Sequence, residues 1–271
     1  MNLKKVFLVE GTRIPFQLSG TGYKDLSSYQ LASYSLKNLI NKLKISKVDN
    51  IIFGNVIQDS KTSNISREAS LLSGIDVTTP CNTVTMACIS SNKAITDCVN
   101  ELSLGKSSSC IAGGVETMSD LPIKVSKPIR KILFESRKWK SIPDTLKGFS
   151  QLKVSDIGIE IPSITEFSTN ETMGYSADKL THIWNVSRGD QDEFAVRSHN
   201  LASKAQSENK LSDVIPVNIP NTISVDNVIK HDSNINKLSS LKPVFIKNFG
   251  NITAGNSSSL TDGASSCFLV N

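Results

Sequence analysis

The feature that most constrains this chain is an alternation of strand-like and helix-like stretches over its first 115 residues. Residues 5–10, 51–57 and 110–115 are short apolar runs of the kind found in buried strands. Residues 27–43 and 64–72 instead carry apolar side chains at intervals of three and four, which is helical spacing. We therefore predict an α/β fold with a mostly parallel sheet covered by helices on both faces. In such sheets, sites form at the carboxyl ends of the strands.

Cys88 lies between the strand-like residues 83–86 and a helical pattern that runs to Leu104. A side chain at the start of a helix faces free backbone N–H groups and the positive end of the helix dipole. A thiol placed there loses its proton more easily, so Cys88 is a candidate nucleophile. The alternative is a small buried thiol that fills space in the sheet, which is the usual role of a single cysteine.

The five cysteines indicate a reducing environment rather than a disulfide framework. Their number is odd and none has metal-ligand spacing, so no metal site is predicted. Neither a GxGxxG nor a Walker sequence occurs, which argues against a nucleotide-binding loop. No apolar run is long enough to span a membrane, and the chain enters its first strand at Lys5, which leaves no room for a targeting peptide.

The alternation is lost after Glu116 and is expected to resume at residues 244–246, with a last strand over residues 266–270. Two helices are predicted in between, over residues 175–184 and 190–209. A connection of this length is typical of a functional subdomain. The expected division is therefore a core of residues 1–118, a basic and partly helical loop subdomain of residues 119–243, and a return to the core over residues 244–271.

The positive charge of the chain is concentrated in one part of this subdomain. Residues 121–154 contain nine Lys or Arg and two acids, a local net charge of +7 against +5 for the whole chain. Residues 128–142 mix apolar and basic side chains in the manner of a basic amphipathic helix, so residues 124–153 are a candidate membrane-surface contact. The alternatives are a solvated positive face or a surface for a partner subunit. No aromatic-basic recognition motif occurs, so no nucleic-acid partner is predicted.

Several segments resemble the motifs of the thiolase family, and they occur in that family's order. Two of them read Met-Ala-Cys-Ile-Ser-Ser-Asn around Cys88 and Ala-Gly-Gly-Val-Glu-Thr-Met-Ser from Ala112. The full set is residues 9–16, 53–56, 86–92, 112–119 and 253–264. The resemblance covers nearly the whole chain and implies a thiolase-like N-terminal half. Within the family, residues 56–59, 67–69 and 166–174 resemble the β-subunits of mitochondrial trifunctional enzymes of fatty-acid oxidation.

This resemblance implies a 3-ketoacyl-CoA thiolase (acetyl-CoA C-acyltransferase) of β-oxidation, in which Cys88 carries the acyl group before its transfer to coenzyme A. It also implies that Met173 packs beside the acyl group and that Ser258 meets the pantetheine arm. Coenzyme A is then a co-substrate beside 3-ketoacyl-CoA, and no tightly bound cofactor is expected. The implied partners are further copies of the chain and a trifunctional α-subunit. The implied location is the matrix side of the inner mitochondrial membrane.

The chain also departs from the family pattern. A thiolase has a second half with an Asn motif, a Gly-His-Pro histidine and a Cys-x-Gly-Gly-Gly cysteine, and this C-terminal domain is absent from the 271 residues. The three histidines, His182, His199 and His231, precede no proline and are expected to be solvated or packed on helices. Cys267 is expected to be a strand thiol. The chain by itself is therefore expected to turn over poorly or not at all.

Two alternatives remain open from the residues. One is a biosynthetic acetoacetyl-CoA thiolase of the same fold. By resemblance the short-chain class has a histidine at the position of Thr172, so Thr172 argues against this alternative. The other is a truncated, non-catalytic subunit that acts in assembly. Acyl chain-length preference separates the first from the degradative enzyme.

Overall fold

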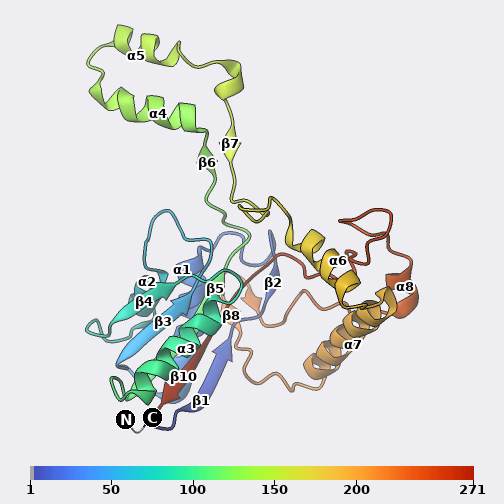
Figure 1. The fold of residues 1–271 in the computed structure, drawn as a ribbon. Coiled ribbons are helices and arrows are strands. Elements are labelled where there is room, and N and C mark those ends of the chain that lie inside the picture. The colour runs from blue at the N-terminus through green and yellow to red at the C-terminus, as the bar shows by residue number, and fades with distance from the viewer. Residues whose placement is uncertain (1–2) are drawn as a thin grey trace. The chain divides into compact units, whose positions relative to one another are not determined.

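The central sheet joins strands that are far apart in the sequence (Figure 1). A computed structural model describes residues 3–271. The sheet order is β1 (Phe7–Arg13), β10 (Thr261–Val270), β5 (Ser109–Glu116), β3 (Asn50–Gly54) and β4 (Cys81–Val84), and β2 (Gln17–Leu18) pairs with β10. β3 is parallel to β4 and β5, whereas β10 is antiparallel to β1, β2 and β5. The strands thus share one direction except for β10, which confirms the mostly parallel sheet.

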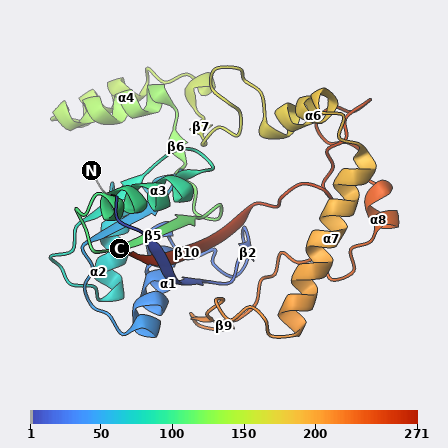
Figure 2. The same cartoon turned by 60° about the horizontal axis from the view of Figure 1, so that its bottom comes forward.

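Helices cover both faces of this sheet, as predicted (Figure 2). α1 (Ser28–Leu43) and α2 (Ile65–Ser73) pack on one face and α3 (Ser90–Ser103) on the other. Alternate residues of β3 serve the two cores: Ile51 and Phe53 join the cluster under α1, and Ile52 joins the cluster under α3. All three side chains are fully buried, because a strand flanked by helices has no solvent-facing side.

The ends of the first two helices follow from their capping residues. Ser27 and Gln30 form a capping box at the start of α1. The Asn64 side chain accepts the Arg67 N–H at the start of α2, and Gly74 ends that helix with a φ of 89°, a conformation that favours glycine. These are the boundaries that the sequence pattern predicts.

Two predicted strands differ from the structure. The apolar run in β1 is exposed rather than buried: Phe7, Leu8 and Val9 are 57%, 63% and 52% accessible. β1 is the edge strand, and its first three residues are exposed on both faces, since successive side chains of a strand point to opposite sides. The strand expected at residues 244–246 does not form, because a carboxylate competes for its backbone. Asp178 accepts the N–H groups of Ile246 and Ile252, which fixes this segment as a loop. The last strand is longer than the predicted residues 266–270, since β10 begins at Thr261.

The chain divides into two compact units, one of Leu121–Ser163 and one of the remaining residues. We call the former the basic hairpin unit. It contains α4 (Lys127–Glu135) and α5 (Ile142–Phe149), short 3₁₀ turns at Ser136–Lys138 and Val154–Asp156, and a two-stranded pairing of β6 (Lys124–Val125) with β7 (Ile159–Glu160). The single amphipathic helix expected over residues 128–142 is thus interrupted after Glu135.

The larger unit also holds the helices predicted in the second half of the excursion. They are α6 (Met173–Ile183) and α7 (Arg188–Ser207), followed by α8 (Ile235–Ser239) and a short pairing of β8 (Val217–Asn218) with β9 (Thr222–Ile223). The division at residues 118 and 243 stays a prediction, and the basic hairpin unit accounts for only part of the expected subdomain. In residues 3–271, no helix has the length and apolar content needed to cross a bilayer.

Candidate active site

Cys88 lies in the tight turn between β4 and α3, at the position predicted from the sequence. The side chain is exposed, which excludes the alternative of a buried space-filling thiol. The preceding residue, Ala87, has a φ of 46°, a left-handed conformation that is uncommon for a residue with a Cβ. Such backbone strain persists only where the surroundings hold it, and it is frequent at active sites.

The hydroxyl of Ser90 stabilises this turn by two hydrogen bonds to its backbone. It accepts the N–H of Met86 at 2.9 Å and donates to the carbonyl oxygen of Ala87 at 2.6 Å. Ser90 is only 4% exposed. The α3 N-cap residue is Ile89, which provides no side-chain cap, so side chains do not occupy the first N–H groups of the helix. The Ser90 hydroxyl therefore fixes the two residues that precede Cys88, and the amino end of α3 beside the thiol carries no side-chain cap.

Two glycines let α3 approach the sheet closely. A Cβ at Gly54, the last residue of β3, would overlap the backbone of Ser90 and Ser91. A Cβ at Gly114 in β5 would overlap the Ser91 side chain. The amino end of α3 thus rests directly on the carboxyl ends of two neighbouring strands, which places Cys88 at the predicted edge of the sheet.

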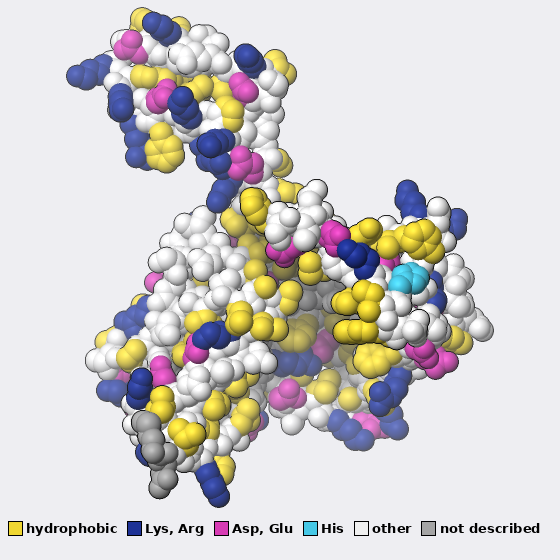
Figure 3. Space-filling view, in the orientation of Figure 1, with side chains coloured by type: hydrophobic (Ala, Val, Ile, Leu, Met, Phe, Trp, Pro, Cys, Tyr) yellow, Lys and Arg dark blue, Asp and Glu magenta, His cyan; other side chains and the backbone are white. Residues whose placement is uncertain are grey.

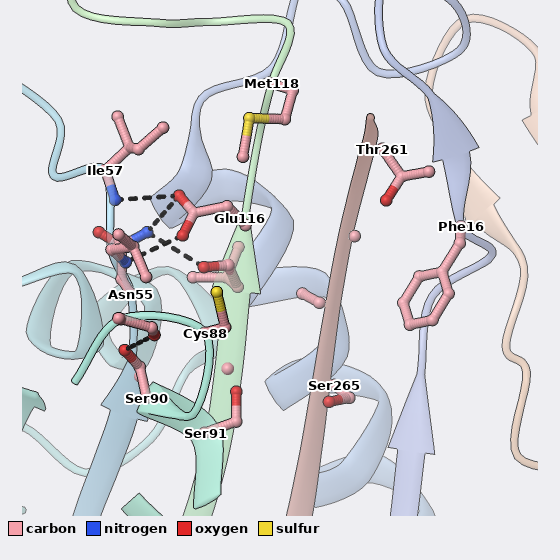
Figure 4. A pocket seen from close by; sticks show the side chains of 17 residues that line it. Phe16, Asn55, Ile57, Cys88, Ser90, Ser91, Glu116, Met118, Thr261 and Ser265 are labelled. Carbon is pink, nitrogen blue, oxygen red and sulfur yellow. Dashed lines mark hydrogen bonds between the residues drawn. The ribbon is translucent and has the colours of Figure 1, made fainter. Parts of the chain in front are cut away.

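Cys88 opens into a cavity of about 410 Å³ with a mostly apolar wall (Figure 4). Across it from Cys88 lie Phe16 and Thr261, and Met118 and Ile57 stand near its rim. Among residues 3–271, Glu116 is the one ionisable side chain besides Cys88 that lines the cavity. The other lining residues are Gly54, Asn55, Val56, Ala87, Ser90, Ser91, Gly114, Val115, Gly263, Ala264 and Ser265.

Glu116 ends β5 and binds the loop that follows β3. Its carboxylate accepts the N–H groups of Val56 and Ile57 at 2.9 and 3.2 Å, and the Asn55 amide at 3.1 Å. Burial raises the pKa of Glu116 above its ordinary value, and these hydrogen bonds oppose the rise. The same loop is tied to the nucleophile segment, since the Thr85 hydroxyl donates to the Asn55 carbonyl at 2.6 Å.

Buried carboxylates position two further walls of the cavity. Asp226 forms a bidentate pair with Arg13 at 2.7 and 2.8 Å and accepts the Phe16 N–H at 2.6 Å, which fixes the turn that carries Phe16. Asp262, fully buried in β10, accepts the Met118 N–H at 2.7 Å. Charge-assisted hydrogen bonds of this kind are strong, so these walls are well defined.

A second cavity, of about 720 Å³, adjoins the first and contains Ser258 in its lining. Phe16 and Thr261 line both cavities and form their common boundary. The loop that carries Ser258 is held by Asn256, whose amide donates to the buried Asp192 at 2.9 Å and whose oxygen accepts the Thr253 N–H at 2.7 Å. Phe194 and His199 of α7, Lys237 of α8 and Lys230 of the loop between them also line it. Asp232 lines it too and forms an ion pair with Lys237.

The structure does not bring the third predicted site residue to either cavity. Met173 begins α6, is 55% exposed, and lines neither of the two. The histidines also lie away from Cys88: His182 contacts the Phe249 carbonyl, His199 accepts the Lys230 N–H, and His231 bonds Ser203. Cys267 is half-buried in β10, and burial raises its pKa to about 11, as expected for a strand thiol.

Sequence reasoning did not single out Ser90, Glu116 or Phe16. Each lies inside one of the thiolase-like motifs, in residues 9–16, 86–92 or 112–119, but nothing local marks its role. The available signal was positional, because Glu116 follows two glycines at the end of a predicted strand and Ser90 opens a predicted helix. In the part of the chain that the structure describes, no group of three His, Cys, Asp or Glu side chains is arranged to hold a metal.

The site and fold define the class of protein. The family model described as "Thiolase, N-terminal domain" matches residues 6–271, so the chain belongs to the thiolase family. The mitochondrial trifunctional enzyme subunit beta of Mus musculus is 49% identical over 273 residues, which is 99% of this chain and 57% of that protein. A probable 3-ketoacyl-CoA thiolase of Caenorhabditis elegans is 46% identical over 99% of this chain and 61% of its own length.

Among solved structures, the acetyl-CoA acetyltransferase of Bacillus anthracis matches with a TM-score of 0.83 and 28% identity, over 100% of this chain and 66% of that one. The comparisons thus confirm both the family and the fold. The chain spans a little over half the length of the curated relatives it matches.

Proposed function

We propose that the chain acts in a 3-ketoacyl-CoA thiolase of fatty-acid β-oxidation, with Cys88 as the nucleophile that carries the acyl group. One observation carries this proposal. An exposed thiol at the amino end of α3 opens into an apolar cavity, and that cavity adjoins a second one lined by cationic side chains. Such a pair suits a substrate with an apolar acyl end and an anionic coenzyme end.

The reaction uses the thiolate twice. In the first step the Cys88 sulfur attacks the C3 carbonyl of 3-ketoacyl-CoA, the bond between C2 and C3 breaks, and its electron pair leaves as the enolate of acetyl-CoA, which takes up a proton. In the second step the thiolate of free CoA attacks the thioester on Cys88. The bond to Cys88 breaks, the acyl group leaves on CoA, and the thiolate is restored.

The backbone beside Cys88 suits the charge that develops in both steps. Cys88 immediately precedes Ile89, the N-cap residue of α3, so its N–H lies at the amino end of that helix. A free N–H at the open end of a helix is a donor for an oxygen that gains negative charge in a tetrahedral intermediate. We propose this N–H as one such donor.

The adjoining cavity supports a role for Ser258 in binding the pantetheine arm of CoA. Ser258 is exposed on the loop held by Asn256, and the arm would pass the common boundary at Phe16 and Thr261 to reach Cys88. Lys230 supplies positive charge for the phosphates at the far end, whereas Lys237 is ion-paired with Asp232 in the same wall. The proposed role of Met173 beside the acyl group rests on the resemblance alone.

The direct test is to trap the intermediate. Incubation of the purified chain with a 3-ketoacyl-CoA should add the shortened acyl mass to the peptide that contains Cys88, and Cys88→Ala should abolish the adduct. Because Cys88 and Glu116 are the only ionisable groups in the first cavity, we expect the 271-residue chain to be slow in the proton transfers. Thiolysis by this chain at a rate normal for the family would contradict that expectation.

The same acylation experiment tests two alternatives, a biosynthetic thiolase and a non-catalytic subunit. Acylation of Cys88 that falls as the ketoacyl chain lengthens would favour a biosynthetic acetoacetyl-CoA thiolase. The cavity wall of Phe16, Val56, Ile57 and Met118 supports the longer substrates instead. A non-catalytic subunit that acts in assembly would form no adduct with either substrate.

The proposed setting is mitochondrial, with further copies of the chain and a trifunctional α-subunit as partners. The name of the mouse relative, a mitochondrial trifunctional enzyme subunit beta, supports the setting and the α-subunit. The basic hairpin unit supports contact with an anionic membrane surface, because Phe134, Ile142 and Leu146 are 63%, 77% and 67% exposed among Lys and Arg side chains (Figure 3). Binding to cardiolipin vesicles that persists at moderate salt would support this contact, and no binding at low salt would exclude it.

A further inference from the structure

Two glutamates bind the two ends of the same strand. At the start of β3, Glu101 accepts the Asn50 amide at 3.0 and 2.9 Å. At its end, Glu116 accepts the Asn55 amide and two loop N–H groups. Both glutamates are half-buried, and each binds an asparagine at one end of β3, Asn50 as its first residue and Asn55 directly after it. The difference is their location, because only Glu116 lines the cavity of Cys88.

The loop that Glu116 binds forms part of the cavity wall. Val56 is 42% exposed, and both Val56 and Ile57 line the cavity with apolar side chains. Neither residue belongs to a strand or helix, so their backbone N–H groups depend on the carboxylate for partners. Figure 4 shows these bonds converging on Glu116 directly above the Cys88 sulfur.

We propose that Glu116 is a positioning residue that fixes Val56 and Ile57 as the apolar wall against which the acyl chain on Cys88 lies. Glu116 then sets acyl-chain preference without touching the reacting atoms. The identity of the occupant, an acyl chain, rests on the proposed function. Asn55 connects this wall to the segment that precedes Cys88. Its carbonyl accepts the Thr85 hydroxyl, and its N–H donates to the Val84 carbonyl at 3.1 Å.

The charge of Glu116 is what the loop requires. A carboxylate offers two acceptor oxygens to three donors, whereas a glutamine has only one acceptor and would turn its NH₂ toward an N–H or an amide donor. Glu116→Gln therefore keeps the size of the side chain but breaks part of the bonding. Glu101→Gln makes the same chemical change at the other end of β3 and is the matched control.

The experiment compares two maleimides that share one reactive group and differ in chain length. N-octylmaleimide and N-ethylmaleimide are reacted with the full chain, and the rate at the Cys88 peptide is measured by mass spectrometry. The ratio of the octyl rate to the ethyl rate cancels both the reactivity of the maleimide and the thiolate fraction of Cys88. What remains is the contribution of the cavity wall to holding an alkyl chain.

We expect Glu116→Gln to lower this ratio by at least about threefold, which corresponds to lost contact with roughly one methylene group. Glu101→Gln should leave the ratio at the wild-type value, even where the two variants lose the same thermal stability. An unchanged ratio in Glu116→Gln, or an equal fall in both variants, would overturn the proposal. The measurement requires no turnover, so absence of an acyl adduct from ketoacyl-CoA would count against the proposed function and leave this ratio as it is.

Discussion

Gly54 and Ser90 are in backbone contact, with no side chain between the end of β3 and the start of α3. This contact sets the depth at which the nucleophile turn lies in the sheet edge. Gly54→Ala would force the helix start away from the strand, because the new methyl group overlaps the Ser90 and Ser91 backbone. We expect a loss of about 1–3 kcal/mol in unfolding free energy, as for other overpacked sites.

The measurement is urea unfolding, together with the rate of N-ethylmaleimide labelling at Cys88, which should change as the turn moves. Gly158→Ala is the control, since no atom lies within 4 Å of a Cβ there. Wild-type labelling in a folded Gly54→Ala protein would show that the contact does not position Cys88.

The hydroxyl of Ser90 is the second determinant of the turn. Ser90→Ala would leave the Met86 N–H without its acceptor and would take one of two donors from the Ala87 carbonyl, which keeps the Ser90 backbone N–H at 3.1 Å. Ala87 must still keep its left-handed conformation, so we expect a cost of about 1–3 kcal/mol for the unsatisfied N–H and an altered labelling rate at Cys88. The neighbouring exposed Ser91, changed to Ala, serves as control. Equal effects of the two variants on labelling would argue against a specific role of Ser90.

The pKa of Glu116 gives a pH dependence with a defined sign. Burial raises this pKa in the folded chain above the ordinary value of 4.5, so the folded protein keeps the proton at pH values where the unfolded chain has lost it. The free energy of unfolding contributed by Glu116 therefore falls as pH rises through the window between 4.5 and the raised pKa, and is constant above it.

Glu116→Gln removes this titration, so the difference in unfolding free energy between wild type and variant should decline across that window and then level off. Urea unfolding of both proteins from acid to neutral pH measures the difference and cancels the other carboxylates. A difference that rises with pH would mean that the hydrogen bonds from the loop outweigh burial.

The link between Asn256 and Asp192 predicts an effect on coenzyme binding. Asn256→Ala would free the Thr253 N–H and remove one hydrogen bond from the buried Asp192, which loosens the loop that carries Ser258. We expect the dissociation constant for CoA, measured by calorimetry, to rise about tenfold, the equivalent of one lost hydrogen bond. Asn64→Ala, at the helix cap of α2, is a control of similar stability cost. Equal affinity in the two variants would contradict the role of this loop.

Local sequence signals were sufficient to predict elements whose ends are set by their own capping residues or apolar pattern. The boundaries of α1 and α2 follow from Ser27, Asn64 and Gly74, each of which acts on its own helix. The place of Cys88 follows for the same reason, because a strand pattern stops and a helix pattern starts within a few residues of it.

Features that depend on distant residues could not be predicted in this way. The apolar run Phe7-Leu8-Val9 has the composition of a buried strand, yet its exposure is decided by its place at the sheet edge. Residues 244–246 have strand composition, but a carboxylate on α6 binds their backbone. The roles of Glu116 and Ser90 also depend on tertiary contacts, since each side chain binds backbone groups outside its own strand or helix.

The reversed strand β10 has a consequence for how this chain is made. It is inserted between β1 and β5, so the first strand has no neighbour in the main sheet until residues 261–270 have left the ribosome. The α/β segments between them can form while synthesis continues, but β1 must wait for a strand that lies far along the chain. Completion of the sheet thus depends on a pairing of high contact order, which is slow to form.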